Sequence, residues 1–205
     1  MLIFHEARLV VFSVPRTGST SLHKALRPFA DIEFSNPPTK KHMNVRRFEA
    51  WAAEKRPRLL GYRRAAVMRD PLARLASWYA YRQRDAVADE PTSTRGMTFE
   101  EFITLALTET PPPPAAVGNQ HFFLTRKGGA LGVDDIFCIE RSDVMMAYFE
   151  DIFGKLELPH HNGSPAVEID LSEAMEGRLR AERAPEFKLF DRVAGAGRLS
   201  VTREA

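Results

Sequence analysis

Residues 9–26 are the most constraining stretch of the sequence, because an apolar run, a turn of small residues and a helix-forming segment follow one another there. Residues 9–14 (LVVFSV) are β-branched and apolar on both faces, which is typical of a strand buried in a parallel sheet. Residues 15–20 (PRTGST) predict a turn, and residues 21–26 predict a helix that Pro28 ends. A buried strand that leads directly into a helix indicates an α/β fold.

Strand-like and helix-like segments alternate along the rest of the chain. Apolar runs at residues 65–68 and 136–139 predict two further strands. Amphipathic spacing predicts helices at residues 45–54, 72–83, 99–107 and 143–153, and again from residue 171 onward. This order predicts an α/β fold built on a P-loop-like parallel β-sheet flanked by helices. The length fits a single domain over residues 1–205, with the last residues expected to fray.

The composition excludes several classes of protein. Lys and Arg number 29 against 27 Asp and Glu, a formal charge of +2, so a protein that coats nucleic acid is excluded. Cys138 is the one cysteine, which rules out a disulfide framework and a thiolate zinc site and suits a reducing compartment. No apolar run approaches the roughly 20 residues of a membrane span. We therefore expect a cytoplasmic protein with no metal and no nucleic-acid partner.

The balanced total hides a basic segment. Residues 40–69 contain ten Lys or Arg and two Glu, so their formal charge is +8 and the other 175 residues sum to −6. Part of this excess belongs to solvated helix faces. The segment also lies between the turn at residues 15–20 and a second strand–helix junction, where it would attract a small anionic ligand.

The turn at residues 15–20 has the composition of an anion-binding loop. Small residues between a strand and a helix point backbone N–H groups at one place, and the helix dipole adds partial positive charge there. Arg16 adds a full cation. The turn lacks the Gly-Lys-Ser/Thr ending of a Walker A loop, which argues against hydrolysis of ATP or GTP. An ordinary strand–helix turn with a Ser or Thr N-cap explains the same residues about equally well.

The second strand–helix junction lies at residues 69–79 (RDPLARLASWY). Arg69 follows the predicted strand directly, and a guanidinium there can bind a phosphate through two hydrogen bonds. Ser77 lies about two helical turns later and offers a hydroxyl. A local ion pair between Arg69 and Asp70, with Ser77 filling a small site, is the alternative.

Together the two junctions resemble the cofactor motifs of the sulfotransferases that use 3′-phosphoadenosine 5′-phosphosulfate (PAPS). Residues 15–22 (PRTGSTSL) resemble the 5′-phosphosulfate loop of that family. Residues 69–71, with Arg74, Ser77 and Tyr79, resemble its 3′-phosphate motif, including the eight-residue step from Arg to Ser. The order of the motifs is similar to that in the bacterial and Golgi carbohydrate-type branch, which includes heparan-2-O-type enzymes.

The resemblance implies the sulfotransferase fold, PAPS as co-substrate and no metal. The implied cofactor-binding residues are Arg16, Thr17, Gly18, Ser19, Thr20, Ser21, Arg69 and Ser77. Arg16 is also implied as a catalytic residue, at a position where many members of the family have Lys. Because an arginine is never neutral, it can stabilise the leaving phosphate without donating a proton to it.

The acceptor hydroxyl needs a general base, and His is the usual choice. The resemblance implies His42, because a His in the segment before the 3′-phosphate motif is the base in the heparan-2-O-type relatives. A surface His in a basic loop is the alternative, and Lys41 has either a charge-stabilising or a solvated role. We expect His23 to point outward and the pair at residues 160–161 to lie in a solvated loop.

The leading prediction is transfer of a sulfuryl group from PAPS to the hydroxyl of a small-molecule or carbohydrate acceptor, by in-line displacement. Residues 85–150 are expected to supply the acceptor side, and the candidate lining residues are Phe99, Phe102, Phe122 and Phe123. Arg126 and Lys127 begin a Gly-rich segment that predicts a hairpin turn rather than a cofactor contact.

Two alternatives to this function remain open. One is a P-loop kinase-like phosphotransferase, which needs ATP and Mg²⁺, and the other is a non-catalytic nucleotide-binding module. Nothing in the sequence specifies the acceptor or the oligomeric state.

Overall fold

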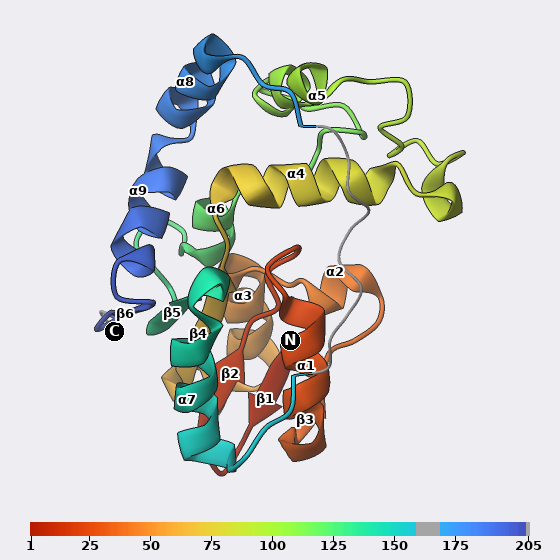
Figure 1. Ribbon diagram of the computed structural model, residues 1–205. Helices are drawn as coiled ribbons and strands as arrows, with labels where there is room; N and C mark the ends of the chain where they lie inside the picture. Colours follow the sequence, from red (N-terminus) through yellow and green to blue (C-terminus); the bar gives the residue numbers. More distant parts are fainter. Residues whose placement is uncertain (159–168, 204–205) are drawn as a thin grey trace.

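The computed structural model describes residues 1–158 and 169–203, and a six-stranded sheet lies at its centre (Figure 1). The order of the strands across the sheet is β3-β1-β2-β4-β5-β6. The strands are β1 (Leu2–Phe4), β2 (Leu9–Val11), β3 (Ile32–Glu33), β4 (Arg63–Met68), β5 (Asp135–Cys138) and β6 (Arg198–Ser200). The three predicted strands correspond to β2, β4 and β5, which lie side by side.

The sheet is mixed: the predicted strands form its parallel part, and antiparallel strands extend it. β2 pairs in parallel with β4, and β4 with β5, whereas β1 and β6 add antiparallel pairs at either side. The three unpredicted strands, β1, β3 and β6, have two or three residues each, too few for a periodic pattern to be recognised. Strand β6 also corrects the expectation that the chain is helical from residue 171 onward. The last two residues, which were expected to fray, lie outside the described part of the chain.

The predicted helices are present to within about two residues at each end, the usual uncertainty of a helix boundary. The helices are α1 (Ser19–Leu26), α2 (Pro38–Lys41), α3 (Val45–Lys55), α4 (Pro71–Arg82), α5 (Phe99–Ala106), α6 (Gln120–Leu124), α7 (Ser142–Phe153), α8 (Glu173–Glu182) and α9 (Ala184–Ala194). In α4, Pro71 occupies the first turn and the Asp70 carboxylate accepts a hydrogen bond from the Ala73 N–H at 2.7 Å. None of the helices in the described ranges is long and apolar enough to cross a membrane.

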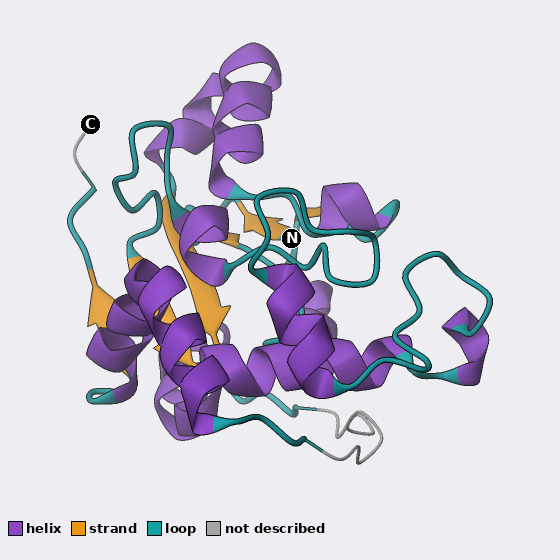
Figure 2. Cartoon of the chain, turned by 90° about the horizontal axis from the view of Figure 1, so that it is seen from above, coloured by secondary structure: helices purple, strands orange, loops and turns teal. Residues whose placement is uncertain are grey.

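Successive strand residues pack into two different core layers. Val10 and Ala66 face helices α3, α6 and α9, whereas Val11 and Val67 face α1 and α7. A third apolar cluster joins α4, α5 and α8. Figures 1 and 2 show α4 lying across the end of the sheet to which β2 and β4 point. Since parallel strands end at one edge, both strand–helix junctions open beneath this helix.

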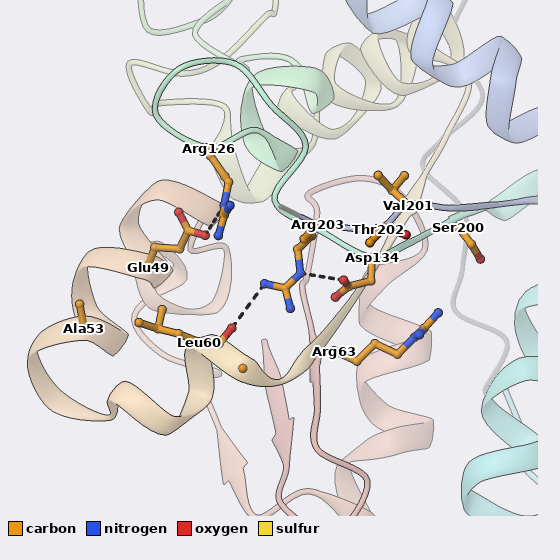
Figure 3. Close-up of a pocket in the computed structure, with 11 residues that line it drawn as sticks. Glu49, Ala53, Leu60, Arg63, Arg126, Asp134, Ser200, Val201, Thr202 and Arg203 are labelled. Carbon is orange, nitrogen blue, oxygen red and sulfur yellow. Dashed lines mark hydrogen bonds and ion pairs between the residues drawn. The ribbon is translucent and has the colours of Figure 1, made fainter. Parts of the chain in front are cut away.

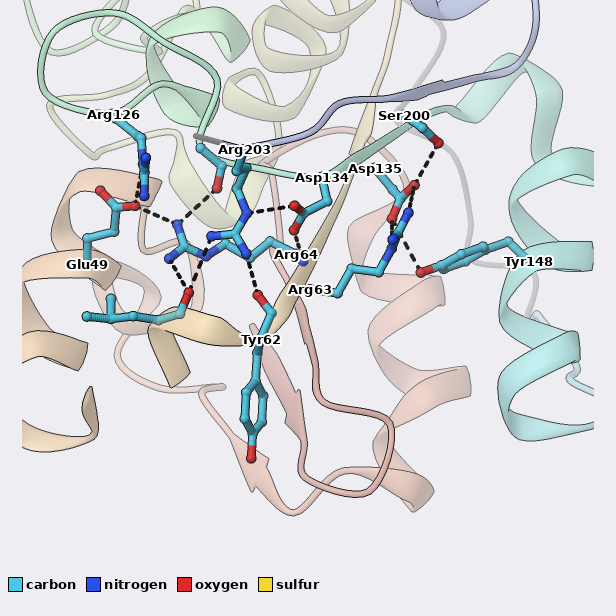
Figure 4. A network of polar contacts seen from close by, with 12 residues as sticks. Glu49, Tyr62, Arg63, Arg64, Arg126, Asp134, Asp135, Tyr148, Ser200 and Arg203 are labelled. Atoms are coloured by element: carbon cyan, nitrogen blue, oxygen red, sulfur yellow. Dashed lines mark hydrogen bonds and ion pairs between the residues drawn. The ribbon is translucent and has the colours of Figure 1, made fainter. Parts of the chain in front are cut away.

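Polar contacts connect three strands at the opposite edge of the sheet, and Figure 4 shows those of Asp135 with Arg63 and Ser200. Asp135 begins β5 fully buried and accepts hydrogen bonds from Arg63 of β4 at 2.5 Å and from Arg198 of β6 at 2.7 Å. Ser200 Oγ donates to the same carboxylate at 3.0 Å. Burial alone would raise the pKa of Asp135, but the hydrogen bonds and charges of Arg63 and Arg198 lower it overall.

The Asp135→Asn variant should unfold more easily than the wild type, because two guanidinium groups lose the buried charge that compensates them. We expect a loss of about 3 kcal/mol in the free energy of unfolding at pH 7, measured by urea denaturation. A lowered pKa stabilises the fold above the unfolded-state pKa and stops doing so as pH falls through the folded-state value. The difference between variant and wild type should therefore shrink below about pH 4. A pH-independent difference would contradict the assignment.

Candidate functional site

The loop at residues 15–20 contains two residues in the left-handed backbone region, which a glycine favours and an arginine does not. Arg16 and Gly18 both have positive φ, at 67° and 70°, and Gly18 occupies the N-cap of α1 without a side-chain cap. The Thr17 side chain is fully buried and donates a hydrogen bond to the Val14 carbonyl at 3.0 Å. Helix geometry leaves the amides of Ser19 and Thr20 without an intrahelical acceptor. The loop is therefore not an ordinary turn capped by Ser or Thr.

Gly18 is required for steric reasons as well as for its φ. A Cβ atom at this position would lie 2.8 Å from Cδ1 of Ile139, the residue that follows β5. The loop thus packs closely against the end of the neighbouring strand. This close approach keeps the backbone N–H groups of the loop at a fixed distance from the sheet edge.

Arg16 connects the two sequence motifs. Its Nε and Nη2 atoms donate to the Ser77 hydroxyl at 3.0 and 2.7 Å, and its guanidinium lies 4.8 Å from the centre of the Tyr81 ring. Ser77 and Tyr81 are one helical turn apart on α4. The predicted proximity of the loop and the second junction is therefore present in the structure.

Arg69 is fixed through its backbone rather than its side chain. The Gln120 side chain accepts from the Arg69 N–H at 2.9 Å and donates to the Arg69 carbonyl at 2.8 Å. The Gln120 N–H in turn donates to Glu186 at 2.7 Å. In residues 1–158 and 169–203 the Arg69 guanidinium makes no ion pair, and the alternative pairing with Asp70 is wrong because that carboxylate caps α4. Gln120 and Glu186 carry no recognisable motif, and the sequence did not identify these contacts.

Arg74 is a buried arginine that joins three segments of the site. It is 3% exposed and donates to the carbonyls of Pro15 at 3.0 Å, Val117 at 3.0 Å and Gly118 at 3.2 Å. Burial lowers its pKa to about 10, so the side chain is charged at neutral pH. Arg74 therefore holds the loop against α4 and against the segment that precedes α6.

Arg84 adds a further cation that the sequence reading missed. Its guanidinium lies 4.9 Å from the centre of the same Tyr81 ring that Arg16 contacts. Burial lowers the pKa of Arg16, and the positive charges of Arg84 and Arg69 lower it further. The signal in the sequence is the spacing of residues 77, 81 and 84 by four and three, with Arg84 two residues beyond the end of α4.

His42 ends α2 and packs against the strand that leads into the loop. Its Nδ1 atom lies 2.6 Å from the Ser13 carbonyl oxygen, which can only accept, so Nδ1 carries the proton in the neutral ring. Nε2 is then unprotonated, and among the described residues it has no hydrogen-bond partner. Burial lowers the pKa of His42 below 6.5, although the Ser13 hydrogen bond opposes this shift. The ring is therefore a neutral base at pH 7.

Lys41, which precedes His42, is half-buried. Burial is also the largest cause of the lowered pKa of its ammonium group.

Two expectations about other residues near the loop are corrected. His23 points inward, not outward: it is 7% exposed and bonds Glu33 of β3 at 2.8 Å, because the unpredicted edge strand lies beside α1. Phe99 and Phe102 are core residues of the third cluster and do not line an acceptor wall. Phe122 is 48% exposed, with the Arg46 guanidinium 4.1 Å from its ring centre. Residues 160–161 lie outside the described part of the chain.

The basic segment at residues 40–69 does not surround the loop as a whole. Arg63 and Arg64 begin β4, about 20 Å from Arg69 at the other end of the strand, and they bind Asp135 and Glu49 there. These pairs neutralise part of the excess charge.

An open cavity of about 820 Å³ lies at that far end (Figure 3). Its lining includes Arg126, which bonds Glu49 at 2.8 Å. Arg126 also begins the predicted hairpin turn, because its N–H bonds the Ala130 carbonyl.

Replacing Arg74 with Met should destabilise the protein by about 3 kcal/mol or more, because three carbonyls lose a charged donor. Urea denaturation followed by circular dichroism measures this loss. Arg178→Gln on α8 is the control, since its exposed ion pair with Glu182 contributes under about 1 kcal/mol. Equal stability of the Arg74 variant and this control would show that Arg74 does not hold the loop.

The comparisons with known proteins agree with this geometry. The model of the sulfotransferase family matches residues 1–170, a range that contains the loop, His42 and both strand–helix junctions. Comparison with curated proteins and with solved structures gives no match. The mixed α/β sheet flanked by helices is consistent with the fold of that family. Since the match covers most of its length, the chain belongs to the sulfotransferase family, whose members transfer sulfuryl groups.

Proposed function

We propose that this protein is a PAPS-dependent O-sulfotransferase. The observation that carries the proposal is the convergence of Arg16, Ser77 and Arg69 at one edge of the sheet, next to a helix N-terminus. PAPS has two anionic ends, the 3′-phosphate and the 5′-phosphosulfate. Two positively charged positions, Arg16 in the loop and Arg69 before α4, suit a ligand with two anionic ends better than they suit a ligand with a single phosphate.

The 5′-phosphosulfate is assigned to the loop. The amides of Ser19 and Thr20, the hydroxyls nearby and the Arg16 guanidinium all donate, and the positive end of α1 favours an anion. The binding set there is Arg16, Thr17, Gly18, Ser19, Thr20 and Ser21. Thr17 and Gly18 contribute shape and backbone, because the Thr17 hydroxyl is committed to Val14.

The 3′-phosphate is assigned to Arg69 and Ser77. The Gln120 contacts fix the Arg69 backbone and leave its guanidinium without an ion pair in the described ranges. The Ser77 hydroxyl accepts from Arg16, which places it beside the guanidinium that would face the donor. Arg16 and Ser77 therefore link the two ends of the donor site.

His42 is proposed as the general base. Its unprotonated Nε2 would accept the proton of the acceptor hydroxyl while the oxygen attacks sulfur opposite the leaving phosphate. The Ser13 carbonyl fixes the tautomer that leaves Nε2 available. Arg16 would stabilise the charge that develops on the leaving oxygen without giving up a proton.

The acceptor side is proposed to lie within residues 85–150, with a small-molecule or carbohydrate alcohol as acceptor. Metal independence and a cytoplasmic location are part of the proposal. The location is supported by the buried, unpaired thiol of Cys138. A kinase-like phosphotransferase is not favoured, because the loop carries no Gly-Lys-Ser/Thr ending.

Binding of 3′-phosphoadenosine 5′-phosphate, the product of the donor, tests the assignment of Arg69. We expect this nucleotide to raise the melting temperature of the wild type, and Arg69→Ala to weaken binding about tenfold to a hundredfold. The variant should bind adenosine 5′-phosphosulfate, which lacks the 3′-phosphate, as well as the wild type does. Stabilisation by ATP–Mg²⁺ alone would contradict the proposed function.

Replacing His42 with Ala should lower kcat for sulfuryl transfer about a hundredfold or more while donor affinity stays unchanged. In the wild type, activity should be constant near pH 7 and fall only below the ordinary histidine pKa of 6.5, because burial lowers the pKa of His42. The rate at which sulfated products form from a panel of sugar and phenol acceptors measures both effects. Intact donor binding with unchanged transfer would exclude His42 as the base, and absent transfer in the wild type would favour a non-catalytic module.

A further inference from the structure

Arg84 is a cation for which the proposed donor site has no role. It lies just past the end of α4, is half-buried, and its guanidinium rests 4.9 Å from the Tyr81 ring centre. Among the residues that the structure describes, Arg84 forms no ion pair with a carboxylate. Asp85, the nearest acid in sequence, pairs with Arg95 instead. A positive group is therefore fixed beside the site without a counter-charge from the protein.

The position of Arg84 along α4 distinguishes it from Arg69. Arg69 stands just before the first turn of α4 and Arg84 just after its last, so the two cations come from opposite ends of the helix, with Ser77 between them in the sequence. Arg16 contacts the helix between them, at Ser77 and Tyr81. Three guanidinium groups thus follow the helix in the order Arg69, Arg16, Arg84.

This order corresponds to the order of groups in the proposed reaction, on which the inference rests. If Arg69 binds the 3′-phosphate and Arg16 the 5′-phosphosulfate, the donor extends along α4 from its beginning toward its end. In an in-line displacement the acceptor approaches sulfur from the side opposite the leaving phosphate. Arg84 then lies beyond the sulfuryl group, on the side from which the acceptor enters.

We propose that Arg84, supported by the Tyr81 ring, binds an anionic substituent of the acceptor. The acceptor is then an alcohol that already carries a carboxylate, sulfate or phosphate group. The ring contact holds the guanidinium near α4, and a guanidinium can bind such a group through two parallel hydrogen bonds.

The electrostatics of the cluster support this assignment. Arg84 and Arg69 both oppose the charge on Arg16, so the ligand-free site stores repulsion that bound anions relieve. The donor supplies anions at Arg69 and Arg16. An anionic acceptor supplies a negative charge for Arg84 as well, whereas a neutral alcohol leaves the positive charge of Arg84 without a counter-charge.

Inorganic sulfate is the probe for this subsite, used with protein saturated with PAPS so that the phosphate and sulfuryl positions are already filled. We expect sulfate to stabilise the PAPS-saturated wild type in a thermal shift titration. Arg84→Gln should weaken this sulfate effect about tenfold or more, with PAPS affinity within about twofold of wild type. Arg178→Gln removes one positive charge on α8 and is the matched control, which should behave as wild type. Acetate in place of sulfate tests whether a carboxylate is accepted.

Three results would overturn the inference. Sulfate has no effect on the PAPS-saturated wild type, or it affects Arg84→Gln equally, or Arg84→Gln loses PAPS affinity as Arg69→Ala does. The last result would show that Arg84 binds the donor, PAPS, rather than the acceptor. Failure of the wild type to bind PAPS is a different outcome, because it removes the proposed function and this inference with it.

Discussion

The site depends on one buried cation, Arg74, whose N–H groups bond backbone carbonyls and no carboxylate, with Glu186 supplying a compensating charge nearby. Arg74 donates to three carbonyls from the loop and from the segment before α6, and so fixes both against α4. Carbonyl acceptors satisfy its N–H groups but do not cancel its charge, which is why burial lowers its pKa to about 10. The positive potential of Arg74 therefore adds to that of the loop above it. Arg16 is one of the groups that disfavour this charge, so an anion bound at Arg16 stabilises the scaffold as well as the site.

The central part of the fold was predictable because it is encoded locally. β2, β4 and β5 are apolar runs bounded by clear helix starts, and Asp70-Pro71 specifies the beginning of α4 through a cap and a fixed φ. The outer strands were not predictable. β1 and β6 have three residues each and exist because distant chain segments pair with them. Their partners, and with them the antiparallel part of the sheet, follow from tertiary packing rather than from a sequence pattern.

The candidate site also has a part that the sequence predicted and a part that it did not. Arg16, Gly18 and Ser77 belong to spaced motifs, and the structure brings Arg16 and Ser77 into contact. The inward position of His23 was missed because its partner, Glu33, comes from an edge strand with no signal of its own. Arg84 was missed because a cation near a helix end is common on protein surfaces, and only the shared Tyr81 ring distinguishes it.

The support of Arg69 has a consequence for biosynthesis. Both backbone groups of Arg69 bind Gln120, whose own N–H binds Glu186 on α9, beyond the residues that the family model matches. α9 leads into β6, which completes the partners of Asp135. A nascent chain that has emerged as far as the end of α7 therefore contains every motif residue and Gln120, but it lacks Glu186, whose carboxylate holds the Gln120 backbone. A prematurely terminated product of this gene would contain the motif residues of the family without α9 and β6, which complete the fold around them.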